Sequence, residues 1–161
     1  MKIQIAGKIE DSLVNGDGMR MVIFTSGCKH NCEGCHNKPM QDFNYGDQWD
    51  VDELFNYIKD NSDLIDGITY SGGDPIEQIK PIIYLSKRIK TELNLSIWCY
   101  TGYTLEQINN SSNKELLKYI DVLVDGKFLK DRKENALKYT GSSNQRIIYL
   151  KNGEVQKILK S

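Results

Sequence analysis

The sequence predicts an α/β fold built on a largely parallel sheet, and three observations support this prediction. Short apolar runs alternate with segments of helical periodicity, which is the order expected of βαβ units. The runs are continuously apolar, as expected for parallel strands that are buried on both faces. Several runs are followed directly by polar, glycine-containing loops, and a parallel sheet carries its functional residues at such strand ends.

Five segments are predicted to be core strands, because each is a short apolar run bounded by turn-forming residues. In chain order they are residues 21–25, 67–70, 95–100, 122–124 and 146–150. The first leads into a polar loop, rich in glycine and cysteine, that lasts to about residue 48. The last is followed by Asn152–Gly153, a pair favoured in two-residue hairpin turns, so residues 155–159 are expected to return as a terminal hairpin.

Helices are predicted between these strands. Asp50 can cap the first helix, with Glu53 completing a capping box. The apolar positions of this helix follow the spacing i, i+3, i+4, i+7 at Val51, Leu54, Phe55 and Ile58. Pro81 is expected to be the first residue of the second helix, where its missing N–H group costs nothing. A further helical stretch is predicted from about residue 114 to residue 119.

The unusual residues of the chain follow four predicted strands. The corresponding loops contain the cysteines, residues 71–75, residues 101–103 and residues 125–127. Because the carboxyl ends of parallel strands lie at one edge of a sheet, we expect these loops to form one site.

Composition and charge exclude several classes of protein. The chain has 161 residues, 39% of them hydrophobic, which predicts a single domain over residues 1–161. With 21 basic and 22 acidic residues, it has no electrostatic footprint for nucleic acid or for an anionic membrane. No apolar run suits a membrane span, and the first ten residues lack the apolar stretch of a signal peptide. We therefore expect a cytoplasmic protein.

Three of the four cysteines fall in the motif Cys28-x3-Cys32-x2-Cys35. Clustered thiols in a cytosolic chain bind metal or carry out redox chemistry. Three thiolates on one loop can hold a [4Fe-4S] cluster and leave one iron without a protein ligand. The alternative is a structural zinc site, which needs four ligands and could recruit His30, His36 or Cys99. Cys99, inside an apolar strand, is expected to be an inert buried thiol.

The chain resembles the radical S-adenosylmethionine superfamily and, within it, the proteins that activate anaerobic ribonucleoside-triphosphate reductases. The stretches that carry the resemblance are residues 14–20, 27–37, 71–75, 98–103, 121–127 and 141–146. They run in the family's order over nearly the whole chain. The chain departs from the family pattern at one residue. The family loop usually reads Asn-Gly-Pro-Gly, and here Asp17 replaces the proline.

The resemblance implies an incomplete parallel β/α barrel of the radical SAM type, open on one side, with about five core strands and a C-terminal hairpin. It implies a [4Fe-4S] cluster held by Cys28, Cys32 and Cys35, with S-adenosylmethionine chelating the open iron. The implied contacts to S-adenosylmethionine come from two stretches: Gly72, Gly73 and Asp74, and the main chain of Gly34, Cys35 and His36. No catalytic residue is implied beyond the cluster ligands.

The function implied is the activation of an anaerobic ribonucleoside-triphosphate reductase. Reductive cleavage of S-adenosylmethionine would give a 5′-deoxyadenosyl radical, which removes hydrogen from a glycine of the reductase. The reductase large subunit is the implied partner, and a flavodoxin- or ferredoxin-type protein is the implied electron donor. The alternatives are an activase of another glycyl radical enzyme, such as pyruvate formate-lyase, or a small zinc-binding interaction module.

Other polar residues allow two interpretations. Thr101, Asp125 and Lys127 either contact the ribose or carboxylate of a ligand or cap the helices that follow. His30, Arg20 and Arg146 are expected at the surface, where the arginines could pair with acidic groups of this chain or of a partner.

Overall fold

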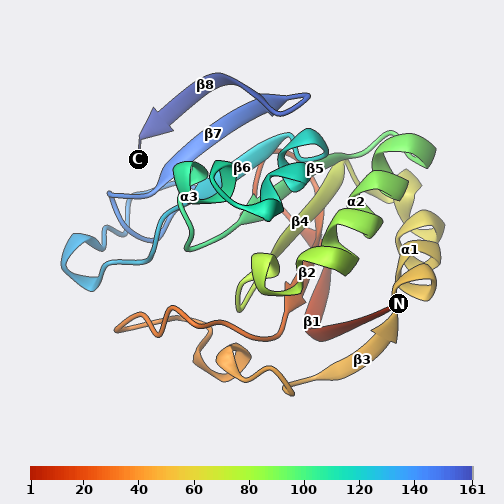
Figure 1. Cartoon of the computed structure of the whole chain (residues 1–161), viewed down its shortest axis with the longest axis horizontal. Helices are drawn as coiled ribbons and strands as arrows, with labels where there is room; N and C mark the ends of the chain where they lie inside the picture. The colour runs from red at the N-terminus through yellow and green to blue at the C-terminus, as the bar shows by residue number, and fades with distance from the viewer. Residues whose placement is uncertain (161) are drawn as a thin grey trace.

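The computed structural model of the chain describes residues 1–160 and contains a single sheet of eight strands (Figure 1). The strands are β1 (Lys2–Ser12), β2 (Arg20–Thr25), β3 (Asp47–Asp50), β4 (Gly67–Gly72), β5 (Ser96–Tyr100), β6 (Val122–Asp125), β7 (Arg146–Lys151) and β8 (Glu154–Lys160). Their order across the sheet is β3-β1-β2-β4-β5-β6-β7-β8.

The four central strands β2, β4, β5 and β6 are parallel to one another. The outer pairs are antiparallel: β1 with both β2 and β3, and β7 with both β6 and β8. The sheet ends at β3 and β8 and is therefore open. The α/β class is confirmed. The partial parallel barrel is not confirmed, and the expected strand count is wrong, because the fifth predicted strand is antiparallel and two further strands are present.

The two strands absent from the sequence prediction are β1 and β3. β1 buries Ile3 and Ile5 at alternate positions, but residues 9–11 are exposed, so it lacks a continuous apolar run. β3 contains no apolar run either, and it pairs with β1 from Lys2↔Asp50 to Ile5↔Asp47. Backbone pairing of this kind leaves little trace in the side-chain pattern.

Three α-helices are present in the described residues, α1 (Val51–Asp60), α2 (Ile79–Glu92) and α3 (Leu105–Asn109). Asp50 caps α1 as predicted, with Oδ1 accepting hydrogen bonds from the amides of Asp52 and Glu53. Pro81 is not the first residue of α2, which begins at Ile79, but it lies in the first turn, where backbone N–H groups have no intrahelical acceptor. The helical stretch predicted at 114–119 is a 3-10 helix, Ser112–Lys118.

The main core lies between one face of the sheet and the helices (Figure 1). Ile68, Ile97 and Leu123 of the parallel strands belong to the same buried cluster as Leu54 of α1 and Leu85 of α2. A second, smaller cluster comprises Trp98, Val122, Val124 and Ile147, with Tyr100, Tyr139 and Tyr149 packed against it. Because neighbouring strand residues alternate between the two clusters, the smaller cluster lies on the other face of the sheet.

The C-terminal hairpin is present as predicted. Asn152 and Gly153 both have positive φ angles, 52° and 83°, as a type I′ turn between β7 and β8 requires. Every residue of β8 is exposed. No helix within residues 1–160 has both the length and the apolar character needed to cross a bilayer.

Candidate metal and cofactor site

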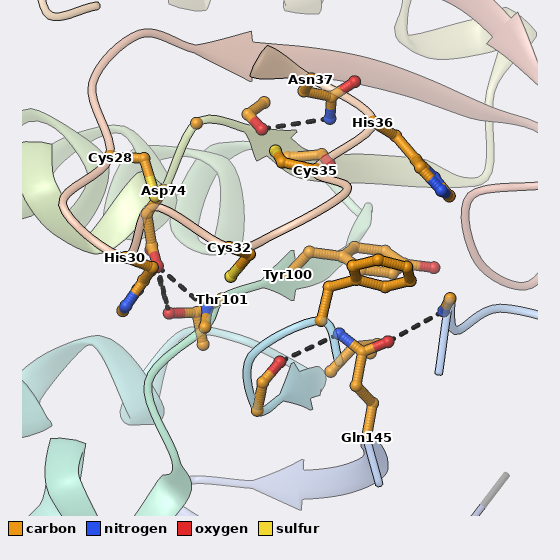
Figure 2. A pocket seen from close by; sticks show the side chains of 18 residues that line it. Cys28, His30, Cys32, Cys35, His36, Asn37, Asp74, Tyr100, Thr101 and Gln145 are labelled. Carbon is orange, nitrogen blue, oxygen red and sulfur yellow. Dashed lines mark hydrogen bonds and ion pairs between the residues drawn. The ribbon is translucent and has the colours of Figure 1, made fainter. Parts of the chain in front are cut away.

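The four loops that follow β2, β4, β5 and β6 border a single pocket (Figure 2). The lining residues are Cys28, His30, Cys32, Cys35, His36, Asn37, Ser71, Gly72, Gly73, Asp74, Tyr100, Thr101, Gly102, Val124, Gly126, Phe128, Gly141 and Gln145. The residues singled out for metal or cofactor binding are among them, except Gly34 and the alternative zinc ligand Cys99. Lys127 and Asp125, considered as ligand contacts, are also outside the lining.

The cysteine loop is held by backbone hydrogen bonds at its first residues. The Gly27 amide donates to the Met40 carbonyl at 2.8 Å, and the Gly27 carbonyl accepts from the Asp74 amide at 2.8 Å. Gly27 has a φ of 100°, and a Cβ there would lie 2.4 Å from the Phe43 ring, so only glycine fits. Cys28, Cys32 and Cys35 are free, partly exposed thiols that surround the pocket from this one loop (Figure 2).

Burial raises the pKa of two of the motif thiols, Cys28 and Cys32. It raises the pKa of Cys28 to about 11, with smaller contributions from neighbouring groups. It also raises the pKa of Cys32, although a hydrogen bond from the Phe128 backbone and the charge of Lys127 act in the opposite direction. Cys28 is therefore a neutral thiol at neutral pH in the metal-free chain, and it must lose its proton to bind a metal.

The Gly72–Gly73 turn packs tightly against the cysteine loop. Gly72 has a φ of 111°, and a Cβ there would lie 2.4 Å from the carbonyl oxygen of Thr25. A Cβ on Gly73 would lie 2.5 Å from the carbonyl oxygen of Gly27 and 2.6 Å from that of Met40. Both glycines are thus required by the chain itself, in addition to any contact with a ligand.

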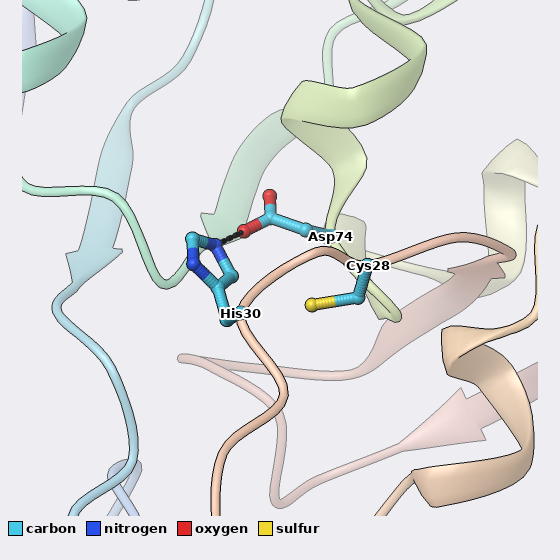
Figure 3. Close-up of side chains that lie close together, drawn as sticks. All are labelled: Cys28, His30 and Asp74. Carbon is cyan, nitrogen blue, oxygen red and sulfur yellow. Dashed lines mark hydrogen bonds and ion pairs between the residues drawn. The ribbon is translucent and has the colours of Figure 1, made fainter.

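His30 is not at the surface, as the sequence led us to expect. Its side chain is 7% exposed, and Nε2 lies 2.6 Å from the Asp74 carboxylate (Figure 3). Ligand atoms of Cys28, His30 and Asp74 lie within 4.8 Å of one another. Within this trio, His30 and Asp74 are the hydrogen-bonded pair, and Asp74 also accepts from Thr101 and from the amides of Ile76 and Gly102.

The geometry favours a cluster over a single zinc ion. Two thiolates on one zinc ion lie at most about 4.6 Å apart, twice the Zn–S distance. Among residues 1–160, the three motif thiols do not form a group whose ligand atoms all lie within 4.8 Å. The pocket volume is about 210 Å³, many times the roughly 10–15 Å³ that one water molecule needs. Cys99, proposed as a fourth zinc ligand, is fully buried and does not line the pocket. The donor set and space therefore fit a multi-iron cluster with a bound small molecule.

Two arginines have other positions than expected. Arg20 is 1% exposed, and it donates hydrogen bonds to side chains and carbonyls of β4, β5 and the preceding loop. Arg146 is partly buried and pairs with both Asp125 and Glu106. Asp125 in addition accepts a hydrogen bond from the Leu105 amide at the start of α3, so its carboxylate helps to cap a helix that precedes it in the chain, and not one that follows it, as was expected.

Asp17, at the position usually occupied by proline, ties its loop to the second face of the sheet. Its carboxylate accepts hydrogen bonds from the hydroxyls of Tyr139 and Tyr149, and its carbonyl accepts from Arg20. These three hydrogen bonds restrain the loop, which in the family pattern is restrained by the rigid proline ring.

Several residues of the pocket wall were not predicted from the sequence. Phe128 packs against the His36 ring with 5.0 Å between the ring centroids. The Gln145 side chain accepts from the Gly141 amide and donates to the Gly126 carbonyl, which joins two loops at the pocket. Tyr100 also lines the pocket, and its buried hydroxyl lacks a hydrogen-bond partner among the described residues. The stretch 141–146 contributed to the family resemblance, but nothing in it alone indicated this role.

Comparison with known proteins gives a consistent result. A family model described as a 4Fe-4S single cluster domain matches residues 14–148. Relatives from Vibrio cholerae and Escherichia coli, both named anaerobic ribonucleoside-triphosphate reductase-activating protein, are each 39% identical to this chain. The alignments cover 83% and 86% of this chain and 89% and 94% of the relatives. A relative of the same name from Enterobacteria phage T4 is 37% identical over 83% of this chain and 86% of its own length.

The family model covers the cysteine loop and all four parallel strands, and the relatives match over most of both chains. The chain therefore belongs to the family of anaerobic ribonucleoside-triphosphate reductase-activating proteins, which carry a 4Fe-4S single cluster domain.

Proposed function

We propose that this chain activates an anaerobic ribonucleoside-triphosphate reductase by generating a glycyl radical on it, as a radical S-adenosylmethionine enzyme. The observation that carries the proposal is the shared pocket, where one loop with three thiols meets the Gly72–Gly73 turn. The names of the relatives supply the partner, a separate reductase. Nothing in the chain favours pyruvate formate-lyase as the target instead.

Cys28, Cys32 and Cys35 would bind the cluster as thiolates. A [4Fe-4S] cluster with three protein ligands supplies an open iron for S-adenosylmethionine and the electron that cleaves it to methionine and a 5′-deoxyadenosyl radical. The role of the protein would be to hold the reactants in the pocket. Tyr100 and Phe128 contribute aromatic walls to the pocket.

The cofactor contacts belong to this proposal. The turn at Gly72 and Gly73 is the part of the wall that would receive the methionyl group, through backbone atoms. The main chain of Cys35 and His36 would lie against the adenine. The close packing of the glycine turn on the cysteine loop supports this, because it brings the two ligand-binding segments together.

We further propose a flavodoxin- or ferredoxin-type electron donor. Residues 127–138 contain five basic and two acidic side chains, whereas the whole chain has a net charge of −1. The five basic side chains, Lys127, Lys130, Arg132, Lys133 and Lys138, are all exposed. The segment borders a surface hollow that also contains Cys32, so an acidic donor bound there would be close to the cluster.

Electron paramagnetic resonance tests the function. After anaerobic reconstitution with iron and sulfide, the protein is mixed with S-adenosylmethionine, a reductant and the reductase. The expected result is a glycyl radical signal on the reductase, together with deuterium transfer to 5′-deoxyadenosine when the reductase glycines are deuterated. Cleavage of the cofactor without transfer of the label would show that the reductase is not the hydrogen donor.

A further inference from the structure

The Asp74 carboxylate is saturated by donors of its own chain. Asp74 is 1% exposed. It accepts hydrogen bonds from the Ile76 amide at 3.0 Å, the Gly102 amide at 2.9 Å, the Thr101 hydroxyl at 2.9 Å and His30 Nε2 at 2.6 Å. A carboxylate offers about four lone-pair positions. The carboxylate therefore joins segments of the chain and has no free position for a further ligand.

His30 is the side chain that brings the cysteine loop into this network. Its ring packs edge-on against Tyr103, with 4.5 Å between centroids. Gly102 makes room for it, because a Cβ there would lie 2.6 Å from the His30 ring. The neighbouring Lys29 differs, since it is 74% exposed and its ion pair with Glu77 spans 3.6 Å. Of these two ion pairs, the one made by His30 is both short and shielded from water.

We infer that Asp74 and His30 are positioning residues that fix the cysteine loop relative to the Gly72–Gly73 turn. The Asp74 amide holds the start of the cysteine loop at the Gly27 carbonyl, and the carboxylate holds its middle through His30. Asp74 thus joins, at two points, the two segments that on the proposed function bind the cluster and the cofactor, and the Asn37 side-chain amide adds a third link by donating to the Gly72 carbonyl at 3.1 Å. Asp74 acts through the chain, and its carboxylate does not bind the cofactor.

Thiol labelling of the cluster-free protein tests this inference without any cofactor. Reduced protein is treated anaerobically with iodoacetamide, and mass spectrometry follows each cysteine separately. In His30→Leu we expect labelling of Cys28 and Cys32 to be about tenfold faster, the change that corresponds to a lost hydrogen bond to a charged group. His30→Gln keeps an N–H donor and should stay within about twofold of the wild type. Lys29→Gln is the matched control and should match the wild type.

Two results would overturn the inference. One is a His30→Leu protein whose labelling rates equal those of the wild type. The other is a His30→Gln protein that behaves like His30→Leu, because the hydrogen bond would then not be the link. If His30→Leu does not fold, Asp74→Ala takes its place, since it removes the carboxylate that His30 contacts, whichever tautomer the ring adopts, and the same tenfold increase is expected.

A second readout uses the reconstituted protein. His30→Leu should keep its iron but need about tenfold more S-adenosylmethionine to change the electron paramagnetic resonance spectrum of the reduced cluster, by the same hydrogen-bond reasoning. An unchanged requirement for S-adenosylmethionine would refute the coupling between the two loops. A wild-type protein that shows no response to S-adenosylmethionine would instead refute the proposed function, and the labelling result would stand by itself.

Discussion

The buried guanidinium of Arg20 donates hydrogen bonds to both the hydroxyl and the backbone carbonyl of Ser96, 76 positions later in the chain. It also donates to the Thr69 hydroxyl and the Ile68 carbonyl. One side chain of β2 therefore joins β4 and β5 near the amino-terminal ends of the parallel strands, whereas the pocket lies at their carboxyl ends. Burial lowers the pKa of this guanidinium to about 10, which leaves it charged at neutral pH.

The first prediction concerns this arginine. Arg20→Lys keeps the charge but cannot reproduce the planar set of donors. We expect the free energy of unfolding to fall by about 2–3 kcal/mol, the range for losing hydrogen bonds made by a charged group. Urea denaturation measures the change. Arg88→Lys, at an exposed ion pair on α2, should change stability by less than about 1 kcal/mol. Equal effects of the two substitutions would contradict the role given to Arg20.

The second prediction concerns the cluster ligands. Replacing Cys28, Cys32 or Cys35 singly by alanine should lower the iron content after reconstitution and abolish reductive cleavage of S-adenosylmethionine. Cys99→Ala should keep both, because Cys99 is buried in the core away from the pocket. Iron analysis and chromatography of the cleavage products are the measurements. Loss of iron in Cys99→Ala, with iron retained in a motif variant, would refute the ligand assignment.

The third prediction concerns the glycine turn. Gly73→Ala places a Cβ against two backbone carbonyls, and backbone atoms cannot turn aside as a side chain can. We expect the cysteine loop to shift, so that iron content and cofactor affinity both fall. Gly7→Ala is the matched control, since a Cβ at Gly7 meets nothing within 4 Å. Full iron content in Gly73→Ala would show that the turn can relax without moving the thiols.

The fourth prediction concerns pH. Burial raises the pKa of the Cys28 thiol from 9.0 to about 11, so its thiolate fraction near neutral pH is about a hundredfold smaller than that of an ordinary thiol. Iodoacetamide labels the thiolate, and labelling of Cys28 in the cluster-free protein should therefore still rise about tenfold per pH unit through the ordinary thiol pKa. A plateau that begins near pH 9, the ordinary value, would contradict the burial of this thiol.

The fifth prediction concerns the electron donor. Lys130→Glu combined with Lys133→Glu should slow reduction of the cluster by an acidic flavodoxin, and high salt should reduce the difference between variant and wild type. Lys87→Glu combined with Lys114→Glu, at exposed sites on α2 and the 3-10 helix, is the charge-matched control. Stopped-flow absorbance measures both. Reduction by dithionite should be unaffected, and an equal loss with dithionite would mean that the cluster itself is damaged.

The parallel strands and the pocket loops could be predicted because they leave local signals. Buried strands such as residues 122–124 are continuous apolar runs, and glycine and cysteine mark the loops that follow several of the strands. The partners of polar side chains leave no such signal. His30 and Asp74 are 44 positions apart, and Arg20 reaches oxygens of residues 68 and 96, so their burial depends on tertiary contacts that no local pattern encodes.

The fully exposed strand β8 has a consequence for how this protein behaves in concentrated solution. An edge strand presents unpaired backbone groups that can template the addition of a foreign strand, and β8 also exposes Val155, Ile158 and Leu159. Lys157 and Lys160 lie in the same strand. Lysine side chains on an edge strand oppose the addition of a further strand in natural proteins. Removing those two charges would leave this edge of the sheet more prone to aggregation.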